Sequence, residues 1–135
     1  MAKEIEKRSN CPISYTLDFF GDKWTFLVMR DLAFKGKCFY KEFLEAGEGI
    51  ATNILSDRLK RLEDQGIVKS EVFEALRTKK KYTLTAKGKA LIPILVEIIV
   101  WGATYDAETD AGPEFVERAK NDREALIAEI LAELE

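Results

Sequence analysis

The stretch that decides the fold is residues 50–66, IATNILSDRLKRLEDQG. When these residues are placed on a helix, Leu55, Leu59 and Leu62 fall on one side, which predicts a stripe that faces the core. The opposite side begins with small polar residues and becomes charged further along. Its residues are Thr52, Asn53, Ser56, Asp57 and Lys60. The segment is therefore predicted to be an amphipathic helix with a polar first half on its exposed side.

The segments next to this helix place it in a larger motif. Residues 39–44 are predicted to form a brief helix, and the break AGEGI follows them. Two helices joined by such a turn make a helix-turn-helix, whose second helix enters the DNA major groove. After Gly66, IVKSEVF and KKKYTLT alternate like strands on either side of a turn, EALRT. Taken singly, these features also fit a solvated helix and a lysine-protected strand edge. In this order they predict a winged helix-turn-helix.

The chain before this motif reads as two helices. Pro12 suits the first turn of a short helix that ends at Gly21. Asp22 is expected to cap the next helix, which ends at Gly36, because its carboxylate can accept the orphan amide hydrogens of a first turn.

The chain after the hairpin reads as two long helices. The first starts at Thr85 and continues through Trp101, with a kink or break expected at Pro93. Its apolar run, residues 91–103, contains 13 residues and is interrupted by a glutamate, so we expect no membrane span. The second, from Pro113, is amphipathic. The predicted fold is mainly α with a two-stranded β-wing, in one domain over residues 1–135.

Composition excludes several classes of function. Histidine is absent, which removes hydrolase triads and histidine–zinc sites. Cys11 and Cys38 are too few for a disulfide framework or a four-thiolate metal site. We therefore expect a cytoplasmic, non-enzymatic protein with no cofactor or metal. The net charge of -3 hides an uneven distribution, since residues 51–90 sum to +5 and residues 91–135 to -8. A basic face in the middle of the chain fits a DNA-binding element, and a solvated lysine-rich face would look the same.

Several motifs in a fixed order carry a resemblance to a known family. They are the Cys-Pro start at 11–12, GDKW at 21–24, LSDRL at 55–59, YTLT at 82–85 and WG at 101–102. The chain resembles the HxlR family of bacterial winged-helix transcriptional regulators, relatives of the MarR group, over about residues 11–103. The family usually has a basic residue at the place of Asn53 and tends to have one at the place of Cys38. Its wing often contains prolines where this chain has LRTK at 76–79.

The resemblance and the residue pattern together imply a homodimer that binds double-stranded operator DNA and regulates transcription. The residues expected in the groove are Thr52, Asn53, Ser56 and Lys60. Arg58 lies nearer the core side, where packing or a phosphate contact is expected rather than base reading. The wing residues expected to contact phosphates are Arg77, Lys79 and Lys81. The alternative is a winged helix that serves as a protein-interaction module without specific DNA binding.

The C-terminal helices are predicted to make the dimer. Residues 104–135 would form a dimerisation helix whose apolar stripe, with the apolar helix 90–103, exceeds what one small domain can cover. The stripe consists of Phe115, Leu126, Ile130 and Leu134. The alternative is a helix that folds back on its own domain.

Cys11 is a candidate redox site. It precedes Pro12 at a helix start and follows Lys7 and Arg8, and helix amides and nearby cations favour the thiolate. In part of the HxlR family the matching cysteine senses oxidants or electrophiles, and the resemblance extends this role to Cys11. The alternative is a small buried hydrophobe. Cys38 is predicted to be structural.

Overall fold

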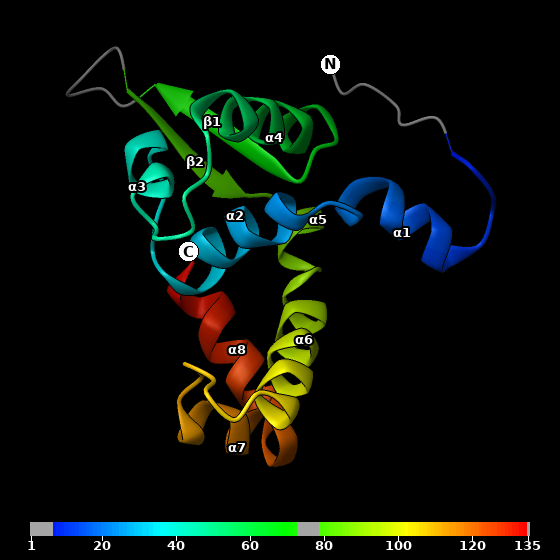
Figure 1. The fold of residues 1–135 in the computed structure, drawn as a ribbon, viewed down its shortest axis with the longest axis vertical. Helices are drawn as coiled ribbons and strands as arrows, with labels where there is room; N and C mark the ends of the chain where they lie inside the picture. The colour runs from blue at the N-terminus through cyan, green and yellow to red at the C-terminus, as the bar shows by residue number, and fades with distance from the viewer. Residues whose placement is uncertain (1–6, 73–78, 135) are drawn as a thin grey trace. The chain divides into compact units, whose positions relative to one another are not determined.

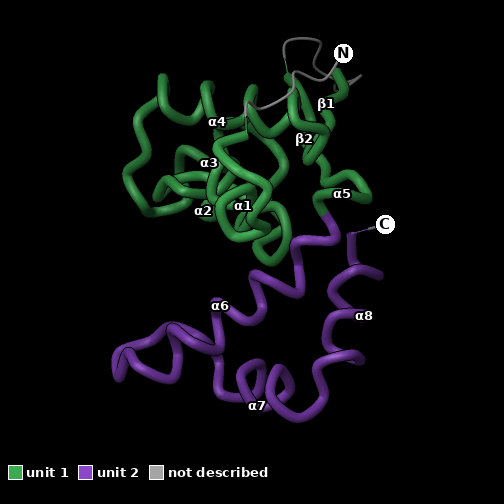
Figure 2. The backbone as a smooth tube through the Cα atoms, turned by 90° about the vertical axis from the view of Figure 1, so that its right-hand side faces the viewer, with its two compact units in different colours: residues 1–88 green, residues 89–135 purple. Residues whose placement is uncertain are grey.

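A computed structural model describes residues 7–72 and 79–134. The chain divides into two compact units, residues 1–88 and residues 89–135 (Figure 2). We call them unit 1 and unit 2. The expectation of a single domain over residues 1–135 stays a prediction.

Unit 1 contains four helices and a hairpin, in the predicted order, and then a short fifth helix whose last residue already belongs to unit 2 (Figure 1). They are α1 (Pro12–Phe20), α2 (Lys23–Phe34), α3 (Tyr40–Leu44), α4 (Thr52–Asp64), β1 (Val68–Val72), β2 (Lys80–Leu84) and α5 (Ala86–Lys89). Unit 2 contains three helices, which are α6 (Ile92–Tyr105), α7 (Pro113–Asn121) and α8 (Arg123–Glu133). A mainly helical chain with a two-stranded antiparallel wing is thereby confirmed.

The core of unit 1 lies beneath α4. Leu55, Leu59 and Leu62 are buried, as the periodicity predicts, and α4 packs against α2 and β1. Burial of each leucine contributes about 1.5–3 kcal/mol to folding. The core stripe therefore leaves the polar side of α4 directed outward.

The hairpin is fixed to the rest of unit 1 at its base. Val68 pairs with Leu84, and both are buried. Tyr82 donates its N–H to the Cys38 carbonyl at 2.8 Å, and Phe39 forms an isolated bridge with Lys81. The entry to α3 thus runs along β2, and α3 also packs on α4. The predicted turn 74–78, which includes Arg77, lies outside the described residues.

Gly88 allows α5 to pack closely against the backbone of Ile67, between α4 and β1. A Cβ at this position would lie 2.2 Å from the Ile67 carbonyl oxygen, so no larger residue fits without a shift of the backbone. The Thr85 hydroxyl accepts a hydrogen bond from the Gly88 N–H at 3.1 Å, as expected of a helix-starting threonine.

The helix predicted to run from Thr85 through Trp101 is divided at Ala90 and Leu91, and Pro93 lies in the first turn of α6. A proline has no N–H to donate within a helix, so it favours a new helix start. By length and composition the stretch Ala86–Tyr105 could cross a membrane. The helix α6 itself has 14 residues, so the expectation of no membrane span stays a prediction.

The prediction of one continuous helix from Pro113 is also wrong. Asp122 leaves the helical region with φ -146° and ψ 42°, and it ends α7 and begins α8. Its N–H bonds to the Arg118 carbonyl, and its own carbonyl accepts the Leu126 N–H. The Arg118 guanidinium contacts the Asp122 carboxylate at 3.3 Å. The apolar period continues through this break, so the sequence pattern does not reveal it.

Candidate nucleic-acid interface

The exposed side of α4 carries the four residues predicted to enter the groove. Thr52, Asn53, Ser56 and Lys60 are all exposed. Their side chains share one face of the helix, since the buried leucines occupy the other. The structure therefore brings these four residues together on a solvent-facing surface. Their contact with DNA is a prediction.

Arg58 joins α4 to the start of α2. Its Nε lies 2.8 Å from Asp22 Oδ2, and its Nη1 lies 2.5 Å from Asp57 Oδ2. The Arg58 side chain is 19% exposed. Of the two roles expected for Arg58, packing or a phosphate contact, these ion pairs favour packing.

Asp22 both caps α2 and binds Arg58 of α4. Its carboxylate accepts the N–H groups of Trp24 and Thr25 at 3.0 and 3.1 Å, which confirms the predicted cap. Burial would raise the pKa of Asp22, but hydrogen bonds from the Thr25 hydroxyl, Arg58 and the Trp24 amide lower it to about 2. The cap therefore carries a full negative charge that faces Arg58 at neutral pH.

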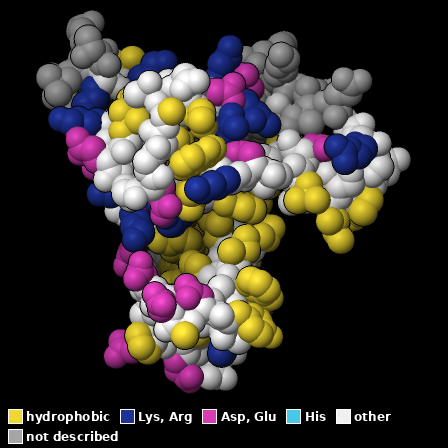
Figure 3. All heavy atoms as spheres, in the orientation of Figure 1, with side chains coloured by type: hydrophobic (Ala, Val, Ile, Leu, Met, Phe, Trp, Pro, Cys, Tyr) yellow, Lys and Arg dark blue, Asp and Glu magenta, His cyan; other side chains and the backbone are white. Residues whose placement is uncertain are grey.

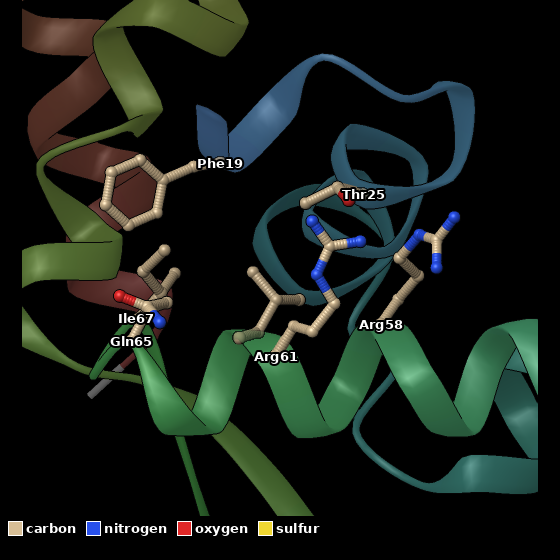
Figure 4. A pocket seen from close by; sticks show the side chains of 7 residues that line it. Phe19, Thr25, Arg58, Arg61, Gln65 and Ile67 are labelled. Atoms are coloured by element: carbon tan, nitrogen blue, oxygen red, sulfur yellow. The ribbon is translucent and has the colours of Figure 1, made fainter. Parts of the chain in front are cut away.

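The interior beside Arg58 has no room for a ligand. A cavity of about 10 Å³ lies between α1, α2 and α4, near β1 (Figure 4). Its lining residues are Phe19, Thr25, Arg58, Arg61, Leu62, Gln65 and Ile67. A volume of roughly 10–15 Å³ holds one water molecule. This cavity therefore belongs to the packing of α4 and is no binding site.

A second ion-pair group holds the turn before α4. Arg30 in α2 contacts Glu48 of the turn at 2.8 Å and the buried Asp31 at 3.0 Å. Burial raises the pKa of Asp31 more than the neighbouring Arg30 and lysines lower it. This group anchors the turn, and sequence reasoning missed it because charged residues eighteen positions apart carry no pairing signal.

Tyr40 is a further residue that sequence reasoning missed. Its hydroxyl lies 2.9 Å from the Thr52 carbonyl oxygen and 3.1 Å from Ser56 Oγ. It therefore joins the first turn of α3 to the first turn of α4.

An open hollow of about 430 Å³ lies between α3 and β2. Aromatic and lysine side chains line it, namely Phe39, Tyr40, Lys41, Lys79, Lys80 and Tyr82. Lys79 Nζ is 4.1 Å from the centre of the Phe39 ring, which fixes its position by a cation–π contact. The hollow borders the exposed side of α4 because Tyr40 belongs to its lining and touches Ser56.

The wing lysines divide between two faces of the hairpin. Strand alternation places Lys80 with Tyr82 on one face and Lys81 on the other, where Glu71 is its cross-strand neighbour. Of the predicted wing residues, Lys79 lies at the hollow and Lys81 does not, while Lys80 and Lys41, which also line it, were not among the predicted site residues.

The two cysteines differ in their surroundings. Cys11 is exposed at the N-terminus of α1, where its carbonyl accepts the Tyr15 N–H, so its alternative role as a buried hydrophobe is not supported. Cys38 is half-buried, with its Sγ 3.8 Å from Glu42 Oε1. Burial, and then the Glu42 carboxylate, raise the pKa of the Cys38 thiol. Cys11 is therefore the more accessible thiol.

The two parts of the predicted dimer surface, the C-terminal stripe and the helix 90–103, differ in exposure. In the C-terminal stripe Leu126 and Ile130 are buried, and Phe115 and Leu134 are half-buried. The C-terminal stripe is therefore largely covered, whereas the helix 90–103 of the same predicted surface keeps exposed apolar residues, and dimerisation through this surface stays a prediction. Exposed large apolar residues instead gather on one side of α6 and on α1 (Figure 3). They are Ile94, Ile98, Trp101 and Tyr105 on α6, which we call the α6 stripe, and Ile13, Tyr15 and Leu17 on α1.

Metal chemistry has no cluster to support it in the part of the chain that the structure describes, since no three His, Cys, Asp or Glu side chains there could hold an ion. What the geometry does define is a short helix, a turn, a second helix with an exposed polar face and an attached hairpin. This combination is that of a winged helix-turn-helix protein.

Comparison with known proteins gives the family. The sequence model of the HxlR-like helix-turn-helix family matches residues 19–110, and the chain belongs to this family. It is 35% identical over 95 residues to the uncharacterised HTH-type transcriptional regulator sll1512 of Synechocystis, which covers 70% of each chain. The resemblance to HxlR-type transcriptional regulators is thereby confirmed.

Two solved structures of regulators share the fold. The redox regulator HypR in its oxidised form matches with a TM-score of 0.63 and 33% identity, over 71% of this chain and 98% of HypR. The quinone-bound YodB of Bacillus subtilis matches with a TM-score of 0.57 and 30% identity, over 70% of this chain and 99% of YodB.

Proposed function

We propose that the chain is a cytoplasmic, non-enzymatic transcriptional regulator that binds specific double-stranded DNA as a homodimer. The observation that carries the proposal is the exposed polar side of α4, which Arg58 and Tyr40 hold in place beside the lysine-lined hollow. Thr52, Asn53, Ser56 and Lys60 enter the major groove, and Lys79, Lys80 and Lys41 face the phosphates next to it. Lys81 and Arg77 stay secondary candidates on the wing.

Asn53→Ala and Lys80→Ala separate base reading from phosphate contact. Asn53→Ala is expected to relax the preference at one base pair and to cost about 1–3 kcal/mol, because an amide can pair with an adenine edge. Lys80→Ala is expected to weaken binding to all sequences alike and to lower the slope of log K against log salt by about one. The measurement is fluorescence anisotropy on duplexes that the protein itself selects from a random pool, at several salt concentrations.

The matched control is Lys69→Ala. Lys69 is an exposed lysine of the same hairpin, and alternation with Ser70, which bonds to Glu63 of α4, directs it away from α4. Wild-type behaviour of both Asn53→Ala and Lys80→Ala would refute the assignment. Selection of no sequence by the wild type, with binding to another protein that survives high salt, would favour the interaction-module alternative.

We place the dimer contact on the α6 stripe rather than on the C-terminal stripe. Its residues recur at helical spacing and leave a continuous apolar band on the outside of unit 2. Apolar bands of this kind mark protein interfaces, and a second copy of the chain is the partner that a two-fold regulator needs. The dimer would present two reading helices about 34 Å apart, one turn of duplex.

Cys11 is proposed to control DNA binding by oxidation or by electrophile addition. The exposure of Cys11 supports this role, as does similarity to a redox regulator and to a regulator solved with bound quinone. Diamide would oxidise Cys11 and a second thiol to a disulfide, and it would take up the two electrons and two protons that these thiols lose. A quinone would add to the sulfur, and the thiol proton would move to the reduced ring.

Treatment with diamide or a quinone is therefore expected to change the operator affinity of the wild type and of Cys38→Ser, while Cys11→Ser keeps its affinity. The physical reason is that a modified Cys11 at the start of α1 would alter how α1 packs, and with it the spacing of the reading helices. The measurement is operator binding before and after treatment, with mass spectrometry of the modified residue. An unchanged wild-type affinity despite confirmed modification of Cys11 would end this proposal.

A further inference from the structure

The proton of the Tyr40 hydroxyl can be assigned from its two contacts. A backbone carbonyl only accepts, so the Tyr40 hydroxyl donates to the Thr52 carbonyl oxygen at 2.9 Å. A tyrosine hydroxyl has one proton, which this bond uses. The contact of 3.1 Å between Tyr40 and Ser56 is then a hydrogen bond only if Ser56 is the donor.

This assignment fixes the polarity of Ser56. A free serine hydroxyl can rotate and either donate to an acceptor or accept from a donor. With its proton directed at Tyr40, Ser56 offers only lone pairs to a molecule in front of α4. Ser56 is exposed, so those lone pairs are available to a partner.

We propose that Tyr40 is a specificity-determining residue of α4: by accepting the proton of Ser56, it makes Ser56 an acceptor that selects an adenine or a cytosine in the major groove. The inference rests on the proposed reading of DNA by α4. In the major groove adenine and cytosine carry an amino donor, whereas guanine and thymine carry a keto acceptor. An acceptor at Ser56 therefore favours an amino base over a keto base on the strand that it approaches.

The same hydrogen-bond polarity argues against a contact between Ser56 and a phosphate. A phosphate oxygen only accepts hydrogen bonds, so an acceptor-only hydroxyl gains nothing from it. Ser56 is therefore assigned to a base edge, and the lysines of the hollow to the backbone.

The experiment selects duplexes from a random pool with the wild type, Ser56→Ala and Tyr40→Phe. At one position the wild type is expected to prefer adenine or cytosine by about 3- to 10-fold, the range of one neutral hydrogen bond. Ser56→Ala loses this preference. Tyr40→Phe keeps the ring but frees the Ser56 proton, so it accepts guanine and thymine at that position as well. For Tyr40→Phe, the slope of log K against log salt stays that of the wild type.

A second measurement changes the DNA. At the selected position the adenine or cytosine is replaced by an analogue that lacks the exocyclic amino group. The wild type is expected to lose about the same 3- to 10-fold in affinity, and Ser56→Ala to lose nothing. Thermal unfolding of each variant shows that the fold is kept.

Two results would overturn the inference while the proposed function stands. One is a wild-type preference for guanine or thymine at the position that Ser56→Ala relaxes. The other is a folded Tyr40→Phe variant with unchanged base preference. Failure of the wild type to select any duplex would instead refute the proposed DNA reading, and this inference with it.

Discussion

Trp101→Glu is expected to convert the protein from a dimer into a monomer and to weaken operator binding by about 100-fold or more, because the two reading helices would no longer bind as a linked pair. Trp101 lies in the α6 stripe with 67% of its surface exposed, and its ring contacts Tyr105, which is 74% exposed. A charge in this band would have to be buried without a partner in the dimer. Sedimentation at micromolar concentration and anisotropy on the selected duplex measure the two effects.

The matched control for this variant is Thr104→Glu. Thr104 is exposed on the same helix but lies to one side of the stripe, so the same charge is added where it can stay in water. Thr104→Glu should therefore remain a dimer with wild-type affinity. If Trp101→Glu still sediments as a dimer, the interface is not on the α6 stripe.

The parts of the fold that the sequence predicts are those that local chemistry determines. Asp22 predicts a cap because a carboxylate before a helix meets free amide groups, and the structure shows both bonds. Gly66, with a φ of +73°, ends α4 because it reaches the left-handed region that other residues avoid. Pro93 predicts the break that begins α6. Each of these signals depends only on residues a few positions apart, so it can be recognised from the sequence.

The contacts that hold the candidate interface depend on tertiary structure. Tyr40 and Ser56 are 16 positions apart, and Arg58 and Asp22 are 36 apart. Nothing in the type or spacing of these residues pairs them until α3, α2 and α4 are packed. The helix periodicity predicts which side of α4 is exposed, but not which neighbour orders its first turn.

The same reasoning explains why the sequence does not separate the covered part of the predicted dimer surface from its exposed part. Periodicity shows that a helix has an apolar side, but not what covers it. Both α8 and α6 have an apolar side, yet Leu126 is buried while Ile98 and Trp101 are exposed.

Asp22→Asn is expected to lower the stability of unit 1 by roughly 2 kcal/mol at pH 7, because the pKa of Asp22 falls from 3.8 to about 2 on folding. The Asp22 side chain is 24% exposed, so solvent screens this interaction only in part. A carboxyl whose pKa is lowered by folding stabilises the fold above its unfolded value. The contribution is therefore complete above about pH 5 and is lost as the pH falls from there toward 2.

The measurement is urea unfolding between pH 7 and pH 3, followed by tryptophan fluorescence. The chain has two tryptophans, so a Trp101→Phe background leaves Trp24, whose N–H donates to the Asp22 cap. The wild type should lose its advantage over Asp22→Asn as the pH is lowered, because protonation removes the same charge in the wild type. Asn still caps the helix and Asp57 still pairs with Arg58, so the variant should remain folded.

Asp57→Asn is the matched control for the same arginine. The Asp57 side chain is 54% exposed, and an exposed ion pair contributes about 0–1 kcal/mol. Removal of its charge should therefore change stability at pH 7 by less than the Asp22 variant does. Equal losses from both variants would mean that Arg58 is held by its two carboxylates alike. The stability that Arg58 provides would then not come mainly from the Asp22 cap, and the orientation of the reading helix would depend as much on Tyr40 and the leucine core.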